Sequence, residues 1–217
     1  MNLKGAIFDQ DGLLFDTEKI YQASWIKSGK LQGVEIDPAF PRRFCGVGRS
    51  IIAEMSAKEY PALDIERYCD TAASLAWEKQ LAEIPEKKPG VVEILNFCKD
   101  HGIRTAVASS SPRRVVTHNL EASGLRDYFD AVVTGDEVTN SKPAPDIFLL
   151  AAKRIGVAPG ACCVFEDAFS GILGANAAGM CAVMIPDQRE PDDEIRAVCR
   201  VYPTLLDAIE VFAASNG

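Results

Sequence analysis

The sequence lacks the features that mark membrane proteins, secreted proteins and repeat proteins. Among its 217 residues no uncharged apolar run approaches the ~20 residues needed to span a bilayer. The first ten residues, MNLKGAIFDQ, are too short and too soon charged for a signal peptide. No internal repeat and no low-complexity segment is present. We therefore expect a globular cytoplasmic protein that does not interact with a membrane.

Positive charge is also scarce. The chain has 23 basic residues against 31 acidic ones, for a formal net charge of −8. A nucleic-acid partner requires a basic face, so we expect no nucleic acid to bind. A small anionic substrate is still compatible with this balance, because a few local positive groups can outweigh the global charge.

Patterns typical of zinc sites are absent as well. The seven cysteines show no CxxC spacing, and no pair of histidines lies near them. Most of them stand in apolar surroundings, as in ACCVF at 161–165. This usage indicates reduced thiols that serve as small core residues in a cytosolic protein.

What the sequence does contain is an alternation of short apolar runs and helical patterns. Nearly half of the residues are hydrophobic, which is enough for a sizeable core at this length. Near-continuous apolar strands separated by helices predict an α/β fold whose parallel sheet is covered on both faces. The expected strands are 4–8, 104–108, 131–134, 162–165 and 181–185. The expected helices between the later strands are 91–101, 112–123, 145–155 and 169–178.

One interval interrupts this alternation. Between about residues 17 and 85 no strand pattern occurs, and glycines and prolines separate three helical stretches at 18–31, 50–60 and 64–83. The sequence PEKKP at 85–89 resembles a linker that returns to the sheet. We therefore predict an α/β core formed by residues 1–16 and 86–217, and an all-helical second domain formed by residues 17–85.

Polar side chains follow four of the expected strands, at the end of a parallel sheet where ligands bind. Carboxylates of this kind are ligands for Mg²⁺, which also makes a cluster of acidic groups tolerable. Serine hydroxyls and a lysine donate hydrogen bonds to phosphoryl oxygens. In strand order these residues are Asp9 and Asp11, then the serines at 109–111, then Lys142, and finally Glu166 and Asp167.

Four motifs at these positions resemble those of the haloacid dehalogenase superfamily, in its phosphatase and β-phosphoglucomutase-like branch. They are FDQDG at 8–12, VASSS at 107–111, SKPAPDIF at 141–148 and FEDAFSGILGANAAG at 165–179. One such motif is weak support, whereas four in register at strand ends are specific. The resemblance implies a Rossmann-like core with an inserted helical cap, and a Mg²⁺-dependent enzyme acting on a phosphorylated small molecule.

The resemblance also implies chemistry for the two aspartates of the first motif. Asp9 would be the nucleophile that forms an aspartyl-phosphate. Asp11 would be the general acid for the leaving oxygen and then the base that activates water. The dehalogenases of the family lack this second acid, so Asp11 also argues against dehalogenation.

The other motifs would hold the phosphoryl group and the metal. Ser109, Ser110 and Lys142 would bind phosphoryl or substrate oxygens and stabilise the charge that develops on them. The metal ligands implied by the resemblance are Asp9, the backbone carbonyl of Asp11, Asp167 and, through a water molecule, Glu166.

The helical interval lies where this branch of the superfamily carries its cap. Such a cap would close over the site, exclude bulk water and contact the rest of the substrate. Residues 45–49, CGVGR, stand where related caps present a glycine-flanked loop with an arginine. Arg49 is therefore a candidate to bind a distal anionic group, and an ordinary surface arginine on a cap helix is the alternative.

Two positions bear on the choice between a phosphatase and a phosphomutase. The relatives that isomerise β-glucose phosphates carry a histidine four residues after a D-T pair, where this chain has Tyr21. They also carry a lysine before the cap glycine, where this chain has Cys45, and Glu18 completes a DTE sequence like that of the phosphatases. We therefore expect a phosphomonoester hydrolase for a sugar-phosphate-like substrate, with a phosphomutase of the β-phosphoglucomutase type as the alternative.

Two other classes fit the residues less well. A phosphorelay receiver domain also uses an aspartate, Mg²⁺ and a lysine on a parallel sheet, but it is much shorter and its acid pair precedes the phosphoacceptor. An inactive family member that only binds a ligand would have lost the nucleophile or the lysine, and this chain keeps Asp9 and Lys142. The expected protein is a monomeric enzyme.

Overall fold

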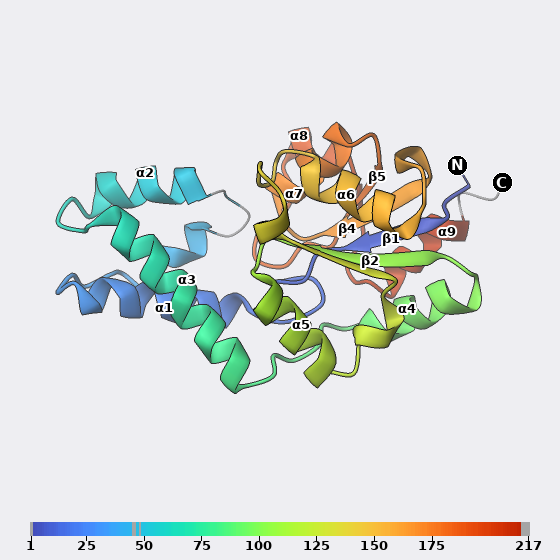
Figure 1. Cartoon of the computed structure of the whole chain (residues 1–217). Helices are drawn as coiled ribbons and strands as arrows, with labels where there is room; N and C mark the ends of the chain where they lie inside the picture. The colour runs from blue at the N-terminus through green and yellow to red at the C-terminus, as the bar shows by residue number, and fades with distance from the viewer. Residues whose placement is uncertain (1, 45–46, 48, 214–217) are drawn as a thin grey trace.

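A parallel sheet of six strands forms the centre of the protein (Figure 1). The computed structural model describes residues 2–44, 47 and 49–213. The α/β fold predicted from the sequence is confirmed, and the five expected strands agree with the structure to within one residue at each end. In spatial order the strands are β3 (Ala131–Thr134), β2 (Arg104–Ser109), β1 (Gly5–Phe8), β4 (Cys162–Glu166), β5 (Cys181–Met184) and β6 (Arg200–Val201).

Helices cover both faces of this sheet (Figure 1). Neighbouring residues of a strand point to opposite faces, so Phe8 and Val107 belong to one buried cluster while Ile7 and Ala106 belong to another. The first cluster is completed by α4 (Val91–Asp100), α5 (Arg113–Ala122) and α9 (Glu210–Ala213). The second is completed by α6 (Asp146–Ile155), α7 (Phe169–Ala177) and α8 (Asp193–Arg196).

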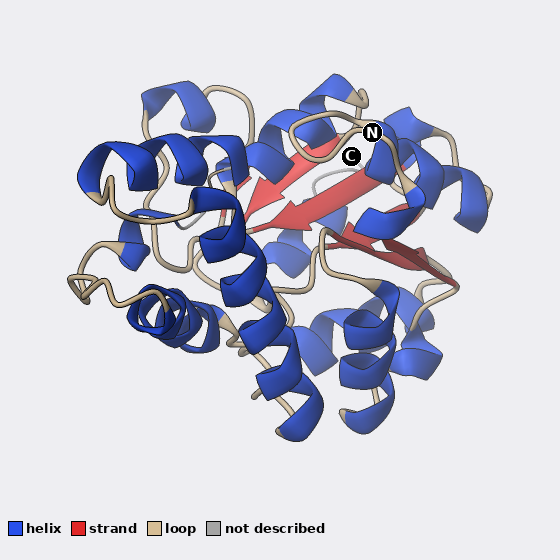
Figure 2. Cartoon of the chain, turned by 60° about the vertical axis from the view of Figure 1, so that its left-hand side comes forward, coloured by secondary structure: helices blue, strands red, loops and turns tan. Residues whose placement is uncertain are grey.

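The segment between β1 and α4 is helical, as the sequence predicts. It contains α1 (Glu18–Leu31), the 3₁₀ turn η1 (Pro41–Phe44), α2 (Arg49–Glu59) and α3 (Ile65–Ala82), and we refer to these four elements together as the helical insert. The insert has its own buried apolar cluster, distinct from the two that pack on the sheet. The carboxyl ends of the strands point toward this insert (Figure 2).

Aromatic side chains dominate the interior of the helical insert. The ring of Trp25 lies 5.0 Å from that of Phe44 and 5.1 Å from that of Tyr68, measured between centroids. Phe40 contacts Phe44 in turn, at 4.9 Å. Large aromatic groups bury much apolar area per residue, which gives this small group of helices a core of its own.

The chain crosses between sheet and insert twice, and the two crossings lie side by side. The backbone N–H of Asp16 donates to the carbonyl of Glu86 at 2.9 Å, and that of Lys88 donates to the carbonyl of Leu14 at 2.9 Å. A third connection is made by side chains, because Asn119 on α5 donates to Gln80 on α3 at 2.7 Å, and both residues are fully buried. These contacts fix the insert against the carboxyl ends of the strands.

The described cysteines are all free thiols. Cys69, Cys98, Cys162 and Cys163 are buried, in keeping with their predicted use as core residues, while Cys45 lies outside the described residues. Within the described ranges, none of the helices has the length and apolar character needed to cross a membrane.

Candidate active site

The side chains that follow the strands converge on one cavity of about 190 Å³. The N–H of Asp9 donates to the carbonyl of Phe165 at 3.0 Å, which extends the pairing of β1 with β4 by one residue. This pairing places Asp9 next to Glu166, although 157 positions separate them in the chain. The predicted residues that line the cavity are Asp9, Asp11, Ser110, Lys142, Glu166 and Asp167.

Lys142 connects the first and the fourth motif. Its Nζ lies 2.5 Å from Asp9 Oδ1 and 2.6 Å from Glu166 Oε1, and it also donates to the carbonyl of Ala108 at 3.0 Å. The side chain is only 6% exposed. Burial by itself lowers the pKa of this amine, but the charges of Asp9 and Glu166 outweigh it and raise the pKa. Lys142 therefore remains a cation inside the site.

The backbone at the start of α7 holds Glu166 in place. Its Oε2 accepts hydrogen bonds from the N–H groups of Asp167 at 3.1 Å and Ala168 at 3.0 Å, while Oε1 faces Lys142. Orphan N–H groups at a helix start commonly bind an acceptor in this way. The carboxylate thus has a fixed orientation and a 1% exposed side chain.

Two glycines of the motifs are needed because carboxylates lie against them. A Cβ on Gly12 would collide with the carboxylate of Asp167, and Gly12 also has a φ of +83°, which favours glycine. A Cβ on Gly171 would collide with the carboxylate of Glu166. Gly12 of FDQDG therefore makes room for an acid of the fourth motif, and Gly171 makes room for an acid of its own motif.

The acidic groups of the cavity suit a hard divalent cation. One oxygen each from Asp9, Glu166 and Asp167 lie within 4.8 Å of one another. Burial, and then the charges of Glu166 and Asp9, raise the pKa of Asp167 well above its usual value. Of the described residues that line this cavity, Lys142 is the one basic side chain, beside five acidic ones. This surplus of buried negative charge and the all-oxygen donor set fit Mg²⁺.

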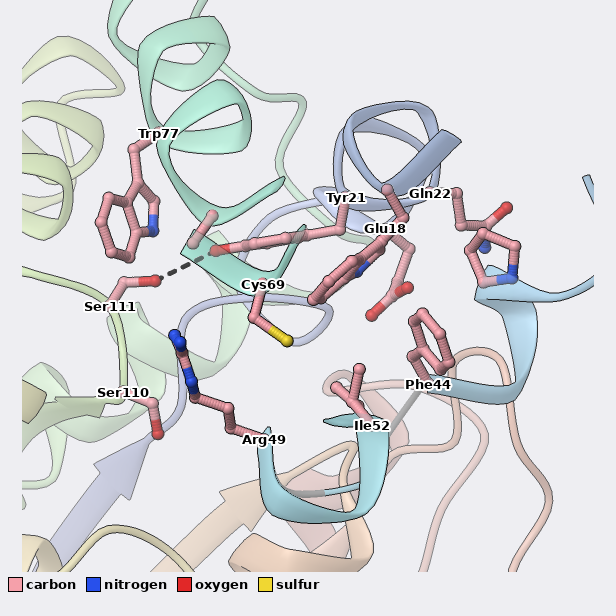
Figure 3. A pocket seen from close by; sticks show the side chains of 13 residues that line it. Glu18, Tyr21, Gln22, Phe44, Arg49, Ile52, Cys69, Trp77, Ser110 and Ser111 are labelled. Atoms are coloured by element: carbon pink, nitrogen blue, oxygen red, sulfur yellow. Dashed lines mark hydrogen bonds between the residues drawn. The ribbon is translucent and has the colours of Figure 1, made fainter. Parts of the chain in front are cut away.

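The carboxyl group of Asp11 has different neighbours from that of Asp9. Its Oδ2 accepts the hydroxyl of Ser111 at 2.7 Å and lies 3.5 Å from the hydroxyl of Ser109. The hydroxyls of Tyr21 and Ser111 are 3.2 Å apart (Figure 3). Burial, followed by the charge of Asp9, raises the pKa of Asp11, while the Ser111 hydroxyl lowers it. A proton is therefore held more readily on Asp11 than on an ordinary aspartate.

A second cavity of about 340 Å³ adjoins the first (Figure 3). The two cavities share Glu18, Tyr21, Ser110 and Ser111 in their walls. Most of the remaining wall comes from the helical insert and is apolar or aromatic. These residues include Trp25, Phe44, Ile52, Cys69 and Trp77.

Arg49 lines this second cavity and is not among the residues that line the first cavity. Its guanidinium forms an ion pair with Asp70 at 2.6 Å, and its side chain is 55% exposed. Val47 reaches the first cavity, whereas the glycines at 46 and 48 of the predicted loop lie outside the described residues. The structure thus brings six predicted residues together around the first cavity, with Ser109 next to Asp11, and leaves Arg49 at the second.

Several residues of the site are not foreseen by the sequence reasoning. From the sequence, Ser111 is one of three serines expected to donate hydrogen bonds to phosphoryl oxygens. In the structure its hydroxyl donates to Asp11 instead. Asp187 lies three residues beyond β5 and forms a further acidic group with Glu18 and Asp167. The rule that locates acids after strand ends applies to Asp187 too, but the contact of Tyr21 with Ser111 spans 90 positions and carries no local signal.

Known proteins that resemble this chain include hydrolases that act on phosphorylated compounds. The haloacid dehalogenase-like hydrolase family matches residues 3–179. The phosphorylated carbohydrates phosphatase of Thermotoga maritima is 35% identical over 185 residues, covering 82% of each chain. The fructose-1-phosphate phosphatase YqaB of Escherichia coli is 38% identical over 186 residues, covering 82% of this chain and 94% of that protein.

Solved structures show the same fold. The β-phosphoglucomutase of Clostridium difficile superposes with a TM-score of 0.75 at 27% identity, covering 94% of this chain and 92% of that one. The matched family spans all four motifs of the candidate site. The chain therefore belongs to the haloacid dehalogenase-like hydrolase family and is an enzyme of its phosphatase type.

Proposed function

We propose that this enzyme is a Mg²⁺-dependent phosphomonoester hydrolase that acts through an aspartyl-phosphate on a small sugar-phosphate-like substrate. The observation that carries the proposal is the buried arrangement of Asp9 beside Lys142, with Glu166 and Asp167 opposite and Asp11 in the same cavity. The names of two relatives, a phosphatase of phosphorylated carbohydrates and one of fructose 1-phosphate, support the substrate class.

In the first half of the reaction, a carboxylate oxygen of Asp9 attacks the phosphorus atom. A bond forms between this oxygen and phosphorus, and the bond from phosphorus to the leaving oxygen breaks. Asp11 gives its proton to the leaving oxygen, so the product departs as a neutral alcohol. Lys142 and the hydroxyl of Ser109 stabilise the charge on the equatorial phosphoryl oxygens.

In the second half, water hydrolyses the aspartyl-phosphate. Asp11 is now a carboxylate and takes a proton from the water as its oxygen attacks phosphorus. The bond from phosphorus to the Asp9 oxygen breaks, which returns Asp9 as a carboxylate and releases inorganic phosphate. The same two acids are then ready for another cycle.

The metal would be held by carboxylates that already face one another. Asp9 and Asp167, the backbone carbonyl of Asp11 and, through water, Glu166 are the proposed ligands. When bound, Mg²⁺ neutralises charge on the phosphoryl group and reduces its repulsion from Asp9. The surplus negative charge of the cavity supports this assignment.

We also propose that residues 17–85 form a cap domain over a core of residues 1–16 and 86–217. The separate apolar cluster of the helical insert supports this division, as do the two adjacent crossings of the chain. The leaving group would lie in the second cavity, whose wall comes mostly from the insert. Arg49, in that wall, is the proposed contact for a distal anionic group of a larger substrate.

The test is hydrolysis of p-nitrophenyl phosphate with Mg²⁺ by the wild type and by Asp9→Asn. We expect the substitution to abolish turnover, since it removes the attacking carboxylate. Asp100→Asn, an exposed acid at the end of α4, is the matched control and should retain full activity. Undiminished turnover by Asp9→Asn would refute the nucleophile, and an inactive wild type would refute the proposed activity.

A further inference from the structure

We propose that Tyr21 and Ser111 are positioning residues that orient the carboxyl group of Asp11 for proton transfer to the leaving oxygen. The inference rests on the proposed function, because it assigns supporting partners to the proposed acid. Its basis is the chain of contacts from Tyr21 through Ser111 to Asp11 Oδ2, with O–O distances of 3.2 and 2.7 Å.

The direction of these hydrogen bonds follows from the number of hydrogens. Ser111 has a single hydroxyl hydrogen, and at 2.7 Å it is donated to Asp11 Oδ2. The Ser111 oxygen can then only accept from Tyr21, whose phenol keeps its hydrogen at neutral pH. Tyr21 therefore orients Ser111, and Ser111 in turn orients Asp11.

The two oxygens of Asp11 are consequently not equivalent. Oδ2 is occupied by the Ser111 hydroxyl, whereas Oδ1 is buried and has no hydrogen-bond partner among the described residues. The Ser111 hydroxyl therefore fixes the orientation of the Asp11 carboxyl group through Oδ2. In the proposed reaction, the O–H bond of the Asp11 carboxyl group breaks as its hydrogen joins the leaving oxygen.

Ser109 remains available for a different task. Its oxygen accepts the backbone N–H of Ser111 at 3.1 Å, and its hydroxyl lies 3.5 Å from Asp11 Oδ2, at the limit of a hydrogen bond. This long contact is weak, so the hydroxyl can turn to donate to a phosphoryl oxygen instead. The neighbouring serines 109 and 111 differ in role, one serving the phosphoryl group and the other the acid.

The position of Tyr21 links the acid to the helical insert. Tyr21 lies on α1, and Ser111 lies in the loop between β2 and α5 (Figure 3). Tyr21 also lines both cavities, so its ring lies between the proposed leaving-group cavity and the site of reaction. The acid is therefore fully positioned only when α1 lies against the core.

The test compares two substrates that carry similar rings and differ in the need for an acid. Benzyl phosphate releases an alkoxide and requires protonation of the leaving oxygen, whereas p-nitrophenyl phosphate releases a stable phenolate. We measure kcat/KM, which includes the steps up to leaving-group departure and excludes the later hydrolysis of the aspartyl-phosphate. Both substrates are assayed with Mg²⁺ and the full chain.

Tyr21→Phe removes only the phenol hydroxyl and is the main variant. General acid catalysis contributes about 10²–10⁴-fold, so we expect kcat/KM for benzyl phosphate to fall about 10-fold in Tyr21→Phe and about 100-fold in Ser111→Ala. For p-nitrophenyl phosphate, kcat/KM of the same variants should differ from that of the wild type by less than about threefold. Tyr128→Phe, which removes a hydroxyl bound to Asn96 on the core surface, should change neither value.

If Tyr21 and Ser111 had a merely structural role, their replacement would lower kcat/KM for both substrates by the same factor. Equal losses for the two substrates, or undiminished benzyl phosphate turnover in Tyr21→Phe, would overturn the inference. Failure of the proposed function has a different signature, because the wild type would then show no Asp9-dependent turnover of either substrate. Melting temperatures of both variants close to that of the wild type would show that folded proteins are compared in the assay.

Discussion

Replacement of Lys142 by methionine tests the electrostatic balance of the site. The amine lies between Asp9 Oδ1 at 2.5 Å and Glu166 Oε1 at 2.6 Å, with a side chain only 6% exposed. Methionine is of similar length and keeps the contact with the Phe148 ring, whose centroid lies 5.1 Å from the amine. The variant therefore removes the cation and leaves the carboxylates packed much as before.

The magnitude follows from leaving buried carboxylates without their partner. Removal of one member of a buried ion pair costs about 3–5 kcal/mol of folding free energy. Lys142 has two partners, so we expect the upper part of this range at pH 8 without Mg²⁺. Activity should also fall by about 10²-fold or more, since one donor to the developing phosphoryl charge is lost.

The loss should depend on pH. Burial raises the pKa of Glu166, with Lys142 opposing, and raises that of Asp167. Between pH 8 and pH 5 the folded protein therefore binds more protons than the unfolded chain, so its stability increases as the pH falls. In Lys142→Met the amine no longer opposes this protonation, and the stability difference from the wild type should be smaller at pH 5 than at pH 8.

The assay is urea denaturation of both proteins at pH 8 and pH 5 in the presence of a chelator. Lys153→Met, at an exposed position of α6, is the matched control and should change stability by less than about 0.5 kcal/mol. A Lys142→Met variant as stable as the wild type at pH 8 would refute the account of the charges. So would a loss that is as large at pH 5 as at pH 8.

Two further predictions concern the metal and the reaction type. Mg²⁺ at 100 times its Kd should stabilise the wild type against urea by about 2.7 kcal/mol and should not stabilise Asp167→Asn; equal stabilisation of both would place the ion elsewhere. Incubation with β-glucose 1-phosphate and a bisphosphate primer should yield no glucose 6-phosphate, because Tyr21 and Cys45 differ from the residues of the mutase relatives. Efficient isomerisation would instead establish the phosphomutase.

Much of the fold can be predicted because its signals are local. β1 and β4 are continuous apolar runs, and α6 places Ile147, Phe148 and Ala151 on one buried face. β6 has only two residues, which is too short for any pattern to show. Strand order also follows from pairing and not from sequence, since β1 lies between β2 and β4.

The candidate site can be predicted in part for the same reason. The acids that follow β1 and β4 are found from strand ends, and their convergence follows from a parallel sheet. The contact of Tyr21 with Ser111 and that of Gln80 with Asn119 join elements far apart in the chain. Such contacts depend on how the helical insert packs against the core, and no local pattern encodes that packing.

The most direct measurement is the identification of the phosphorylated residue. Asp11→Asn mixed with p-nitrophenyl phosphate and Mg²⁺ should still be phosphorylated, because this leaving group needs no acid, but should react slowly with water. After an acid quench, peptide mass analysis should find one phosphoryl group, located on Asp9. Burst release of p-nitrophenol with no phosphoryl group on Asp9, or with the group on another residue, would contradict the aspartyl-phosphate mechanism.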